Sequence, residues 1–287
     1  MIESVVRTAL VTGATSGVGL ATAARLAGAG RAVIIHGPHR EATSNARTTV
    51  ASMHPEAELH EAVADLSSQT EVRALAADIQ RRFDYLDVLV SNAAAVFDQW
   101  SANGDGIERT FAVNQLAPYL LTRLLLSTLE RSGRGRIVIV ASEAHRKAEW
   151  DPGRLESSMP YDRFDAYARS KLANLLFNAE LARRLNGSSV TTNAAHPGTA
   201  RTRLFQPRNP VERIAMPIIN LKALSPGAAS DTVAWLATSS EIAANSGGYY
   251  SQRKPLEPSP AATDRQNASE LWELSAELTD LPVELNP

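Results

Sequence analysis

Short, uninterrupted runs of Val, Ile and Leu alternate along the chain with longer runs in which apolar positions recur with helical spacing. Apolar runs without polar interruption are typical of strands that are buried on both faces of a parallel sheet. We expect strands at residues 5–13, 32–37, 57–66, 86–94, 135–142, 188–198 and 247–251, the last at a sheet edge. We expect helices at residues 18–30, 41–53, 70–83, 109–130 and 166–185. This alternation predicts an α/β fold with a parallel sheet covered by helices on both sides.

The chain contains no internal repeat and no low-complexity linker that would divide it. We therefore expect one domain over residues 1–287, with a helical tail over residues 260–287. Two stretches have irregular composition, 143–160 and 199–226, and both follow the end of an expected strand. Because α/β sheets bind ligands beyond the carboxyl ends of their strands, these stretches are candidates for a binding site.

Composition and charge exclude several classes of protein. The chain is 44% hydrophobic with a net charge of -2, so no basic surface indicates a nucleic-acid partner. It has no cysteine, which excludes disulfides, thiolate catalysis and cysteine-ligated metals. Its six histidines show no metal-binding spacing, and no G-x-S-x-G motif marks a hydrolase serine. The richest apolar stretch is broken by Arg123 and the N-terminus has no signal pattern, so we expect a cytoplasmic protein with no membrane partner.

A glycine turn, TGATSGVG at residues 12–19, lies between the first expected strand and the first expected helix. Glycines in this position can form a plain flexible turn or a dinucleotide-binding turn, and the strand–turn–helix context favours the second. Gly13 would permit the tight turn, Gly17 would let the backbone approach a pyrophosphate, and Gly19 would allow close helix packing. The turn therefore predicts a dinucleotide cofactor.

A tyrosine and a lysine four residues apart, Tyr167 and Lys171, lie in the otherwise apolar helix expected at 166–185. Residues four apart share one face of a helix, so the phenol and the ammonium would form a single patch. Burying a lysine is costly unless something uses it. With 6 Tyr and 4 Lys in the chain, about 0.08 such pairs are expected by chance. This low number favours a pair with a chemical role over a chance tyrosine beside a lysine that extends its ammonium to solvent.

The glycine turn has the spacing T-G-x-x-x-G-x-G, and together with Tyr167 and Lys171 it makes the whole chain resemble the short-chain dehydrogenase/reductase family. The resemblance implies a Rossmann-type, doubly wound parallel sheet of seven strands in a single domain. The family's Asn-Ala-Gly turn is replaced by Asn92-Ala93-Ala94, so this turn must form with a negative φ at Ala94. Further family motifs match Asp65 after the third strand, Asn114 in the helix at 109–130, Ser142 after the fifth strand, and Pro197, Gly198 and Thr202 after the sixth.

Three longer stretches narrow the resemblance to the retinol-dehydrogenase-like branch of this family: PYDRFDAYARSKLANLLFNAELARRL, HPGTART and LWELSAELTDL. The separation of 25 residues between Ser142 and Tyr167 agrees with that branch. The branch includes reductases of lipophilic ketones and aldehydes. The resemblance therefore implies an oxidoreductase that transfers hydride between a nicotinamide and a carbonyl or alcohol.

The resemblance also implies roles for the matched residues. Tyr167 would be the general acid, with its pKa lowered from about 10 by the ammonium of Lys171, which would also hold the cofactor ribose. Ser142 would orient the substrate oxygen, and Asn114 would hold a water that links Lys171 to solvent. Cofactor contacts are expected from Gly13, Thr15, Ser16, Gly17, Val18, Gly19, Asp65, Leu66, Asn92, Ala93, Tyr167, Lys171, Pro197, Gly198 and Thr202.

The end of the second expected strand, IIHGPHR, bears on the choice of nicotinamide. An acidic residue there would bind the ribose diol of NAD and repel a 2′-phosphate, but Gly37 holds that position. The family's usual arginine is replaced by Pro38, and Arg40 follows within reach. We therefore expect NADP(H) rather than NAD(H), with Arg40 as the phosphate ligand. His39 is expected to be a solvated loop residue.

The segment at 199–226 occupies the place of the family's substrate lid. Its apolar residues, Phe205 and Met216 among them, suggest a bulky lipophilic substrate. An ordinary pair of surface helices over the core is nearly as good an interpretation of this segment. Ser142 and Glu143 are the other candidate substrate contacts.

Three questions stay open at this point. His145 and His196 follow strand ends and could border the site, but a structural role is favoured for each. The apolar helical stretches at 107–130 and 164–185 could form a homodimer or homotetramer interface, as in the family, or serve the monomer core. A nucleotide sensor without turnover is the alternative to an enzyme. The complete catalytic set favours the enzyme: Asn114, Ser142, Tyr167 and Lys171.

Overall fold

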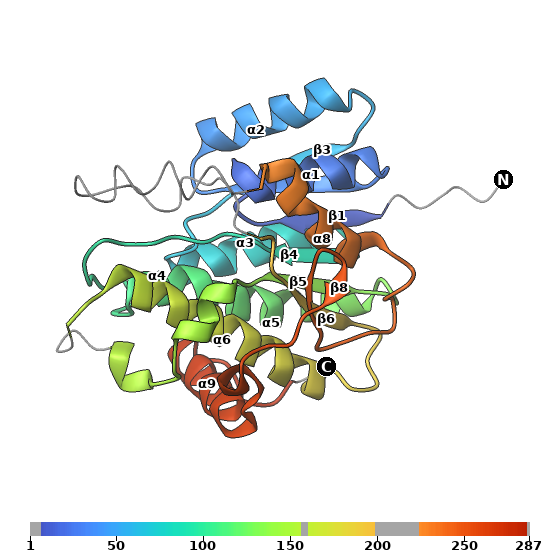
Figure 1. Ribbon diagram of the computed structural model, residues 1–287. Helices are drawn as coiled ribbons and strands as arrows, with labels where there is room; N and C mark the ends of the chain where they lie inside the picture. The colour runs from blue at the N-terminus through green and yellow to red at the C-terminus, as the bar shows by residue number, and fades with distance from the viewer. Residues whose placement is uncertain (1–6, 156–159, 199–223, 286–287) are drawn as a thin grey trace.

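An eight-stranded sheet runs through the computed structural model, which describes residues 7–155, 160–198 and 224–285 (Figure 1). The strand order is β3-β2-β1-β4-β5-β6-β7-β8. Seven strands pair in parallel: β1 Thr8–Val11, β2 Ala32–Gly37, β3 Leu59–Val63, β4 Val88–Ser91, β5 Arg136–Val140, β6 Thr191–Ala195 and β7 Tyr249–Ser251. The order reverses between β1 and β4, so the predicted doubly wound parallel sheet of seven strands is confirmed.

Helices cover both faces of the sheet, as predicted. One face is covered by α1 (Gly17–Gly28), α2 (Arg40–Met53) and α8 (Pro226–Thr238). The other is covered by α3 (Gln69–Arg82), α5 (Ala117–Glu130) and α6 (Arg163–Arg184). Figure 1 shows α9 (Arg265–Leu278) packed against α6 on the side away from the sheet. None of the helices in the described residues is long and apolar enough to cross a bilayer.

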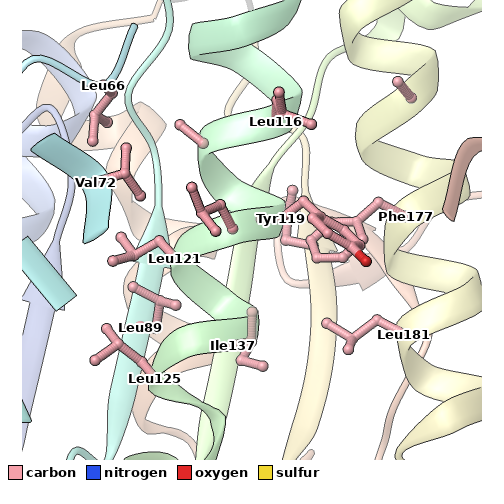
Figure 2. Packing of buried hydrophobic residues seen from close by; sticks show 14 of the residues in the cluster. Leu66, Val72, Leu89, Leu116, Tyr119, Leu121, Leu125, Ile137, Phe177 and Leu181 are labelled. Carbon is pink, nitrogen blue, oxygen red and sulfur yellow. The ribbon is translucent and has the colours of Figure 1, made fainter. Parts of the chain in front are cut away.

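Successive residues in the central strands point into opposite cores. Leu10 of β1 and Leu89 of β4 pack in the core under α3, α5 and α6. Val11 and Val90, the next residues along these strands, pack in the core under α1, α2 and α8. Figure 2 shows Leu89 among the buried residues of the first core. A strand with both faces buried needs an apolar residue at every position, which explains the uninterrupted apolar runs in the sequence.

The eighth strand, β8 (Lys254–Pro255), is antiparallel to β7 and was not expected from the sequence. Gln252 and Arg253 reverse the chain between the two strands, with φ angles of 50° and 59°. Neither residue is glycine, so the usual sequence signal for left-handed backbone is missing here. The Arg253 guanidinium bonds to Asp231 Oδ2 at 2.6 Å, and this contact ties the turn to α8.

Helix starts follow from capping side chains. α6 begins at Arg163, earlier than the expected residue 166, because the Asp162 carboxylate accepts from the backbone N–H groups of Phe164 and Asp165. α8 was not expected as a separate helix. Its start carries the usual signals, since Ser225 caps it and Pro226 occupies the first helical position.

The helix expected over 109–130 is continuous but not uniform. The short α4 (Arg109–Phe111) leads into a π-helical turn, Ala112–Leu116, which continues as α5. Pro118 has no N–H, so it cannot donate to the Asn114 carbonyl four residues earlier, as an α-helix would require. The Asn114 carbonyl is therefore available to a donor from outside its own helix.

Within the predicted C-terminal tail the structure contains α9, which is held by one buried indole. Trp272 is 1% exposed, and its ring centroid lies 5.0 Å from that of Tyr119 and 6.0 Å from that of Phe177. Figure 2 shows Tyr119 on α5 next to Phe177 on α6. The Arg184 guanidinium lies 4.4 Å from the indole centroid, and Trp272 Nε1 donates to the Val283 carbonyl at 2.7 Å.

We predict that Trp272→Ala lowers the free energy of unfolding by about 3–5 kcal/mol, because it leaves a cavity where the indole meets Tyr119 and Phe177. Urea unfolding followed by circular dichroism measures this change. Met53→Ala is the control, since Met53 is 58% exposed. That substitution should change stability by less than about 0.5 kcal/mol. Equal effects of the two substitutions would mean that α9 does not stabilise the domain.

Candidate active site

The glycine turn joins β1 to α1 at the carboxyl edge of the sheet. Gly13 and Gly17 have φ angles of 63° and 56°, which favour glycine. A Cβ on Gly13 would lie 2.7 Å from Ala93 Cα, and one on Gly19 would lie 2.3 Å from the Gly13 carbonyl oxygen. Within the described residues no side chain caps α1, and its first turn holds no acidic residue. This helix N-terminus therefore fits the pyrophosphate of a dinucleotide.

The turn after β4 holds the glycine turn in place. Thr12 Oγ1 accepts hydrogen bonds from Asn92 N at 3.0 Å and Ala93 N at 3.1 Å. The Asn92 side-chain amide donates to the carbonyls of Thr12 at 2.9 Å and Gly13 at 3.2 Å. The turn forms without a positive φ at Ala94, as the alanine at that position predicts. Asn92 thus positions the glycine turn with its side chain.

His36, near the end of β2, bonds to the same turn. The Gly13 N–H donates to His36 Nδ1 at 3.3 Å, and His36 Nε2 lies 3.1 Å from the Ala64 carbonyl oxygen. Because a backbone N–H can only donate, Nδ1 is the acceptor and the ring carries its proton on Nε2. His36 is 1% exposed, and burial lowers its pKa to about 4. The ring is therefore neutral at physiological pH.

The end of β2 has no room for an acidic side chain. A Cβ on Gly37 would lie 2.3 Å from Thr15 Cγ2 and 2.4 Å from Thr43 Oγ1. Arg40 is the first residue of α2 and is exposed. Among the described residues no carboxylate forms an ion pair with it. His39 is exposed just before α2, as expected for a solvated loop residue.

Ser142 and Tyr167 meet where β5 ends. Ser142 Oγ accepts from Ala144 N at 3.2 Å and is hydrogen bonded to the Tyr167 hydroxyl. Burial raises the pKa of Tyr167 above its usual value of 10, and the hydrogen bond to Ser142 only partly offsets this effect. The expectation that the pKa of this phenol is lowered is therefore wrong for this structure. The phenol is protonated at neutral pH.

Lys171 lies one helical turn after Tyr167 and is 3% exposed. Its Nζ donates to the Val140 carbonyl at 2.8 Å and to Asn174 Oδ1 at 3.1 Å, and it lies 5.7 Å from the Tyr167 ring centroid. Burial lowers the pKa of Lys171 to about 7. Tyr167 and Lys171 thus share a patch, as predicted. Burial nevertheless decides both pKa values, and it favours the neutral form of each side chain.

Asn114 joins the loop after β4 to α6. Its Oδ1 accepts from Ala95 N at 2.7 Å, and its Nδ2 donates to the Ala95 carbonyl and to Ser170 Oγ, each at 3.0 Å. Its backbone carbonyl accepts from Asn174 Nδ2 at 2.7 Å. A direct link between Asn114 and Lys171 therefore runs through the Asn174 side chain, and the expected water at Asn114 stays a prediction.

Glu143 follows Ser142 and begins a short 3₁₀ helix, Glu143–Lys147. Its Oε1 accepts from the Tyr249 hydroxyl at 3.1 Å, and its Oε2 accepts from Arg146 Nε at 2.7 Å. Both oxygens are therefore engaged in a link between β7 and this helix. A contact between Glu143 and a substrate stays a prediction.

The structural role favoured for His145 is confirmed. Its side chain is fully buried, its Nδ1 lies 2.7 Å from the Ser142 carbonyl oxygen, and its Nε2 accepts from Ser259 N at 3.1 Å. The ring thus ties the C-terminal segment to the backbone of Ser142. His196 is half-buried after β6, and burial lowers its pKa.

The remaining predicted cofactor residues are spread along the same edge. Asp65 is exposed and its Oδ1 accepts from Ser67 N at 2.8 Å, whereas the Leu66 side chain packs in the core. Leu66 could therefore contact a cofactor only through its backbone. Gly198, after Pro197, has a φ of 81°. Three predicted residues lie outside the described residues: Thr202, Phe205 and Met216.

Three residues that shape the site were not expected from the sequence: Thr12, His36 and Asn174. Each is a polar residue inside an apolar or small-residue run, and such residues need a buried partner. A polar residue in such a run is therefore expected to have a buried hydrogen-bond partner. The run does not name the partners, because most of them lie in distant segments, such as Asn92 for Thr12, Gly13 for His36 and Asn114 for Asn174.

Comparison with known proteins agrees with this geometry. The profile of the family described as short chain dehydrogenase matches residues 7–213. Retinol dehydrogenase 14 from Homo sapiens is 37% identical over 292 residues, which cover 96% of this chain and 87% of that protein.

Two solved structures show the same architecture. The crystal structure of an uncharacterized protein from Mycobacterium paratuberculosis has a TM-score of 0.79 at 30% identity, over 98% of this chain and 95% of that one. The angucycline C-6 ketoreductase LanV, solved with bound NADP, has a TM-score of 0.68 at 25% identity, over 85% of this chain and 93% of that one.

We predict that His36 makes the protein less stable as the pH falls from 6.5 towards 4. The unfolded histidine binds a proton near pH 6.5, whereas the folded one does so only near pH 4. The folded state therefore keeps its full stability above pH 6.5 and loses on the order of 3 kcal/mol by pH 4. His36→Asn keeps an acceptor for Gly13 N but cannot titrate. The measurement is the free energy of unfolding in urea between pH 4 and 7, and identical pH slopes for both proteins would contradict the prediction.

Proposed function

The chain belongs to the short-chain dehydrogenase/reductase family, and we propose that it is an NADP(H)-dependent carbonyl reductase acting on a bulky lipophilic ketone or aldehyde. As a member of the family it is an oxidoreductase of alcohols or carbonyl compounds. The observation that carries the proposal is the hydrogen-bonded pair of Ser142 and Tyr167 beside the buried Lys171. When bound, the nicotinamide supplies the hydride, and the chain supplies orientation and the proton.

The protonation state of Tyr167 supports the reductive direction. Reduction of a carbonyl needs a proton on the oxygen as hydride reaches the carbon. Because the pKa of Tyr167 is raised by burial, the phenol holds its proton at neutral pH and is ready to donate it. Ser142, hydrogen bonded to the same hydroxyl, would hold the carbonyl oxygen within reach of that proton.

Lys171 would bind the cofactor ribose. Two of its three N–H groups are bonded within the described residues, to Val140 and Asn174, and the third is available to a ribose hydroxyl. Lys171 is buried, and this burial lowers its pKa to about 7. Because Nζ is already largely dehydrated, it has little water to lose when the ribose arrives.

The preference for NADP(H) rests on the end of β2. Gly37 leaves no space for the carboxylate that would bind a ribose diol, since Thr15 and Thr43 crowd its Cα. Arg40 is exposed at the start of α2, where it could form a bidentate contact with a 2′-phosphate. The similar ketoreductase LanV was solved with bound NADP.

The lipophilic substrate is supported by the relatives, which include retinol dehydrogenases and an angucycline ketoreductase. The proposed lid lies largely outside the described residues and adds no structural support.

A nucleotide sensor without turnover is the alternative to an enzyme. A panel of lipophilic ketones and aldehydes with NADPH separates the two, because tight NADPH binding without turnover on any member would favour the sensor. We further propose that the protein is cytoplasmic and forms a homodimer or homotetramer.

We predict that Tyr167→Phe lowers kcat by at least about a hundredfold, because the phenolic proton is lost while the ring remains. NADPH affinity should hardly change, since the hydroxyl is not needed to hold the cofactor. Steady-state rates and fluorescence titration with NADPH measure the two quantities. A variant that keeps more than a few per cent of the rate would show that the proton comes from another group.

We predict that Arg40→Ala weakens NADPH binding by about 1.5–3 kcal/mol, the worth of one charge-assisted contact to phosphate. NADH binding should hardly change. Arg47→Ala is the matched control, because Arg47 is also exposed on α2 and carries the same charge. Equal losses for NADPH and NADH, or equal losses in both variants, would show that Arg40 does not contact the 2′-phosphate.

A further inference from the structure

The side chain of Asn174 connects the buried lysine to the π-helical turn. Asn174 lies three residues after Lys171 on α6 and is 1% exposed. Its Oδ1 accepts from Lys171 Nζ at 3.1 Å. Its Nδ2 donates to the Asn114 carbonyl at 2.7 Å and to Gln115 Oε1 at 2.9 Å. One side chain thus bonds to the proposed catalytic lysine and to two residues of the facing helix.

The orientation of this amide follows from its partners. A lysine ammonium can only donate, and a backbone carbonyl can only accept. The Asn174 oxygen must therefore face Lys171 and its nitrogen must face Asn114, which leaves no flipped alternative. All the hydrogen-bonding groups of the amide are used, so the arrangement is rigid.

The π-helical turn makes the arrangement possible. Pro118 has no N–H to give to the Asn114 carbonyl, so that oxygen accepts from Asn174 instead. An asparagine amide has no titrating proton at neutral pH. The link therefore holds Lys171 in place and does not pass protons to Asn114.

We propose that Asn174 is a positioning residue of this site, which holds the Lys171 ammonium beside Tyr167 through an amide bridge to the π-helical turn. The proposal rests on the function proposed above, because its kinetic consequence requires turnover. Its structural consequence, the dependence of the Lys171 ammonium on the Asn174 oxygen, does not.

The surroundings of Lys171 make its titration a clean measure of this bridge. From α6 the titratable group that faces it is Tyr167, whose ring centroid is 5.7 Å from Nζ. From β5 it meets the Val140 carbonyl. Through Asn174 it is joined to the π-helical turn, where Asn114 and Gln115 carry no charge. Among the described residues no carboxylate forms an ion pair with Lys171.

Lysine NMR gives a readout that does not need turnover. The chain has only 4 Lys, so a sample labelled with ¹³C at lysine Cε gives four signals, and Lys171→Arg assigns the one of interest. In the wild type this signal should titrate near pH 7. Asn174→Leu removes the acceptor and should lower the Lys171 pKa further. Asn174→Asp places a carboxylate on the ammonium and should raise the pKa by at least about one unit.

A matched control is available one turn along the same helix. Asn178 is 2% exposed, and its amide bonds to Thr192 Oγ1 at 2.9 Å and to the Gly248 carbonyl at 3.3 Å, away from Lys171. Asn178→Leu removes an equally buried amide and should leave the titration of Lys171 unchanged. A shift of equal size in Asn178→Leu would mean that the Asn174 effect is general loosening, and would overturn the proposal.

Kinetics with NADPH and an accepted ketone complete the test. Asn174→Leu should lower kcat about ten- to hundredfold, because a small displacement of a positioned group is enough for such a loss. The KM for the ketone should hardly change. Asn174→Asp should recover part of kcat, and its pH profile should move towards higher pH. Unchanged rates in Asn174→Leu would overturn the proposal.

The outcomes separate this proposal from the function proposed above. If the wild type turns over no carbonyl but the Lys171 signal shifts in opposite directions in the Leu and Asp variants, the function fails and the bridge stands. If the wild type turns over and both variants titrate like it, the bridge fails and the function stands. Should Asn174→Leu fail to fold, Asn174→Asp decides alone, and an unchanged Lys171 pKa in that variant overturns the bridge.

Discussion

The site is organised around one buried ammonium. Lys171 is 3% exposed, so its charge has lost nearly all of its water and must be stabilised by protein oxygens. The β5 carbonyl of Val140 and the amide of Asn174 supply them. Each of these oxygens is tied to another segment, since Ser142 follows two residues after Val140 and Asn174 binds the turn at Asn114. Placing the lysine therefore also places the segments that carry the other proposed catalytic residues, Ser142 and Asn114.

A break in helical regularity is what lets distant segments meet. Pro118 frees the Asn114 carbonyl, and the Asn114 side chain at the same point holds the loop after β4 through Ala95. That loop begins at Asn92, whose amide binds the glycine turn. Hydrogen bonds through Asn174 and Asn114, together with the short stretch of chain from Asn92 to Ala95, thus connect Lys171 to the proposed cofactor turn. Because buried polar groups are expensive to leave unpaired, loss of one bond in this path exposes its neighbours to the same penalty.

The sequence predicted the parts of this structure that depend on local spacing. Uninterrupted apolar runs and the glycine turn predicted the sheet and its parallel pairing, and Tyr167 and Lys171 share one helix face as their spacing predicted. It did not predict β8, because Gln252 and Arg253 turn with positive φ without a glycine. It also missed His36 and Asn174, whose roles depend on contacts with Gly13 and Asn114, far away along the chain. The predicted lowering of the Tyr167 pKa was wrong for the same reason: burial raises this pKa, and the extent of burial depends on the tertiary structure.

The proposed coenzyme preference and the geometry of the glycine turn both depend on Gly37. A side chain at this position would meet Thr15 in the turn at 2.3 Å and Thr43 in α2 at 2.4 Å. A side chain at residue 37, acidic or otherwise, would therefore require the Thr15 and Thr43 side chains to move or to be shortened. The proposed preference for a 2′-phosphate thus rests on two features, the packing around Gly37 behind the turn and the positive charge of Arg40 in front of it.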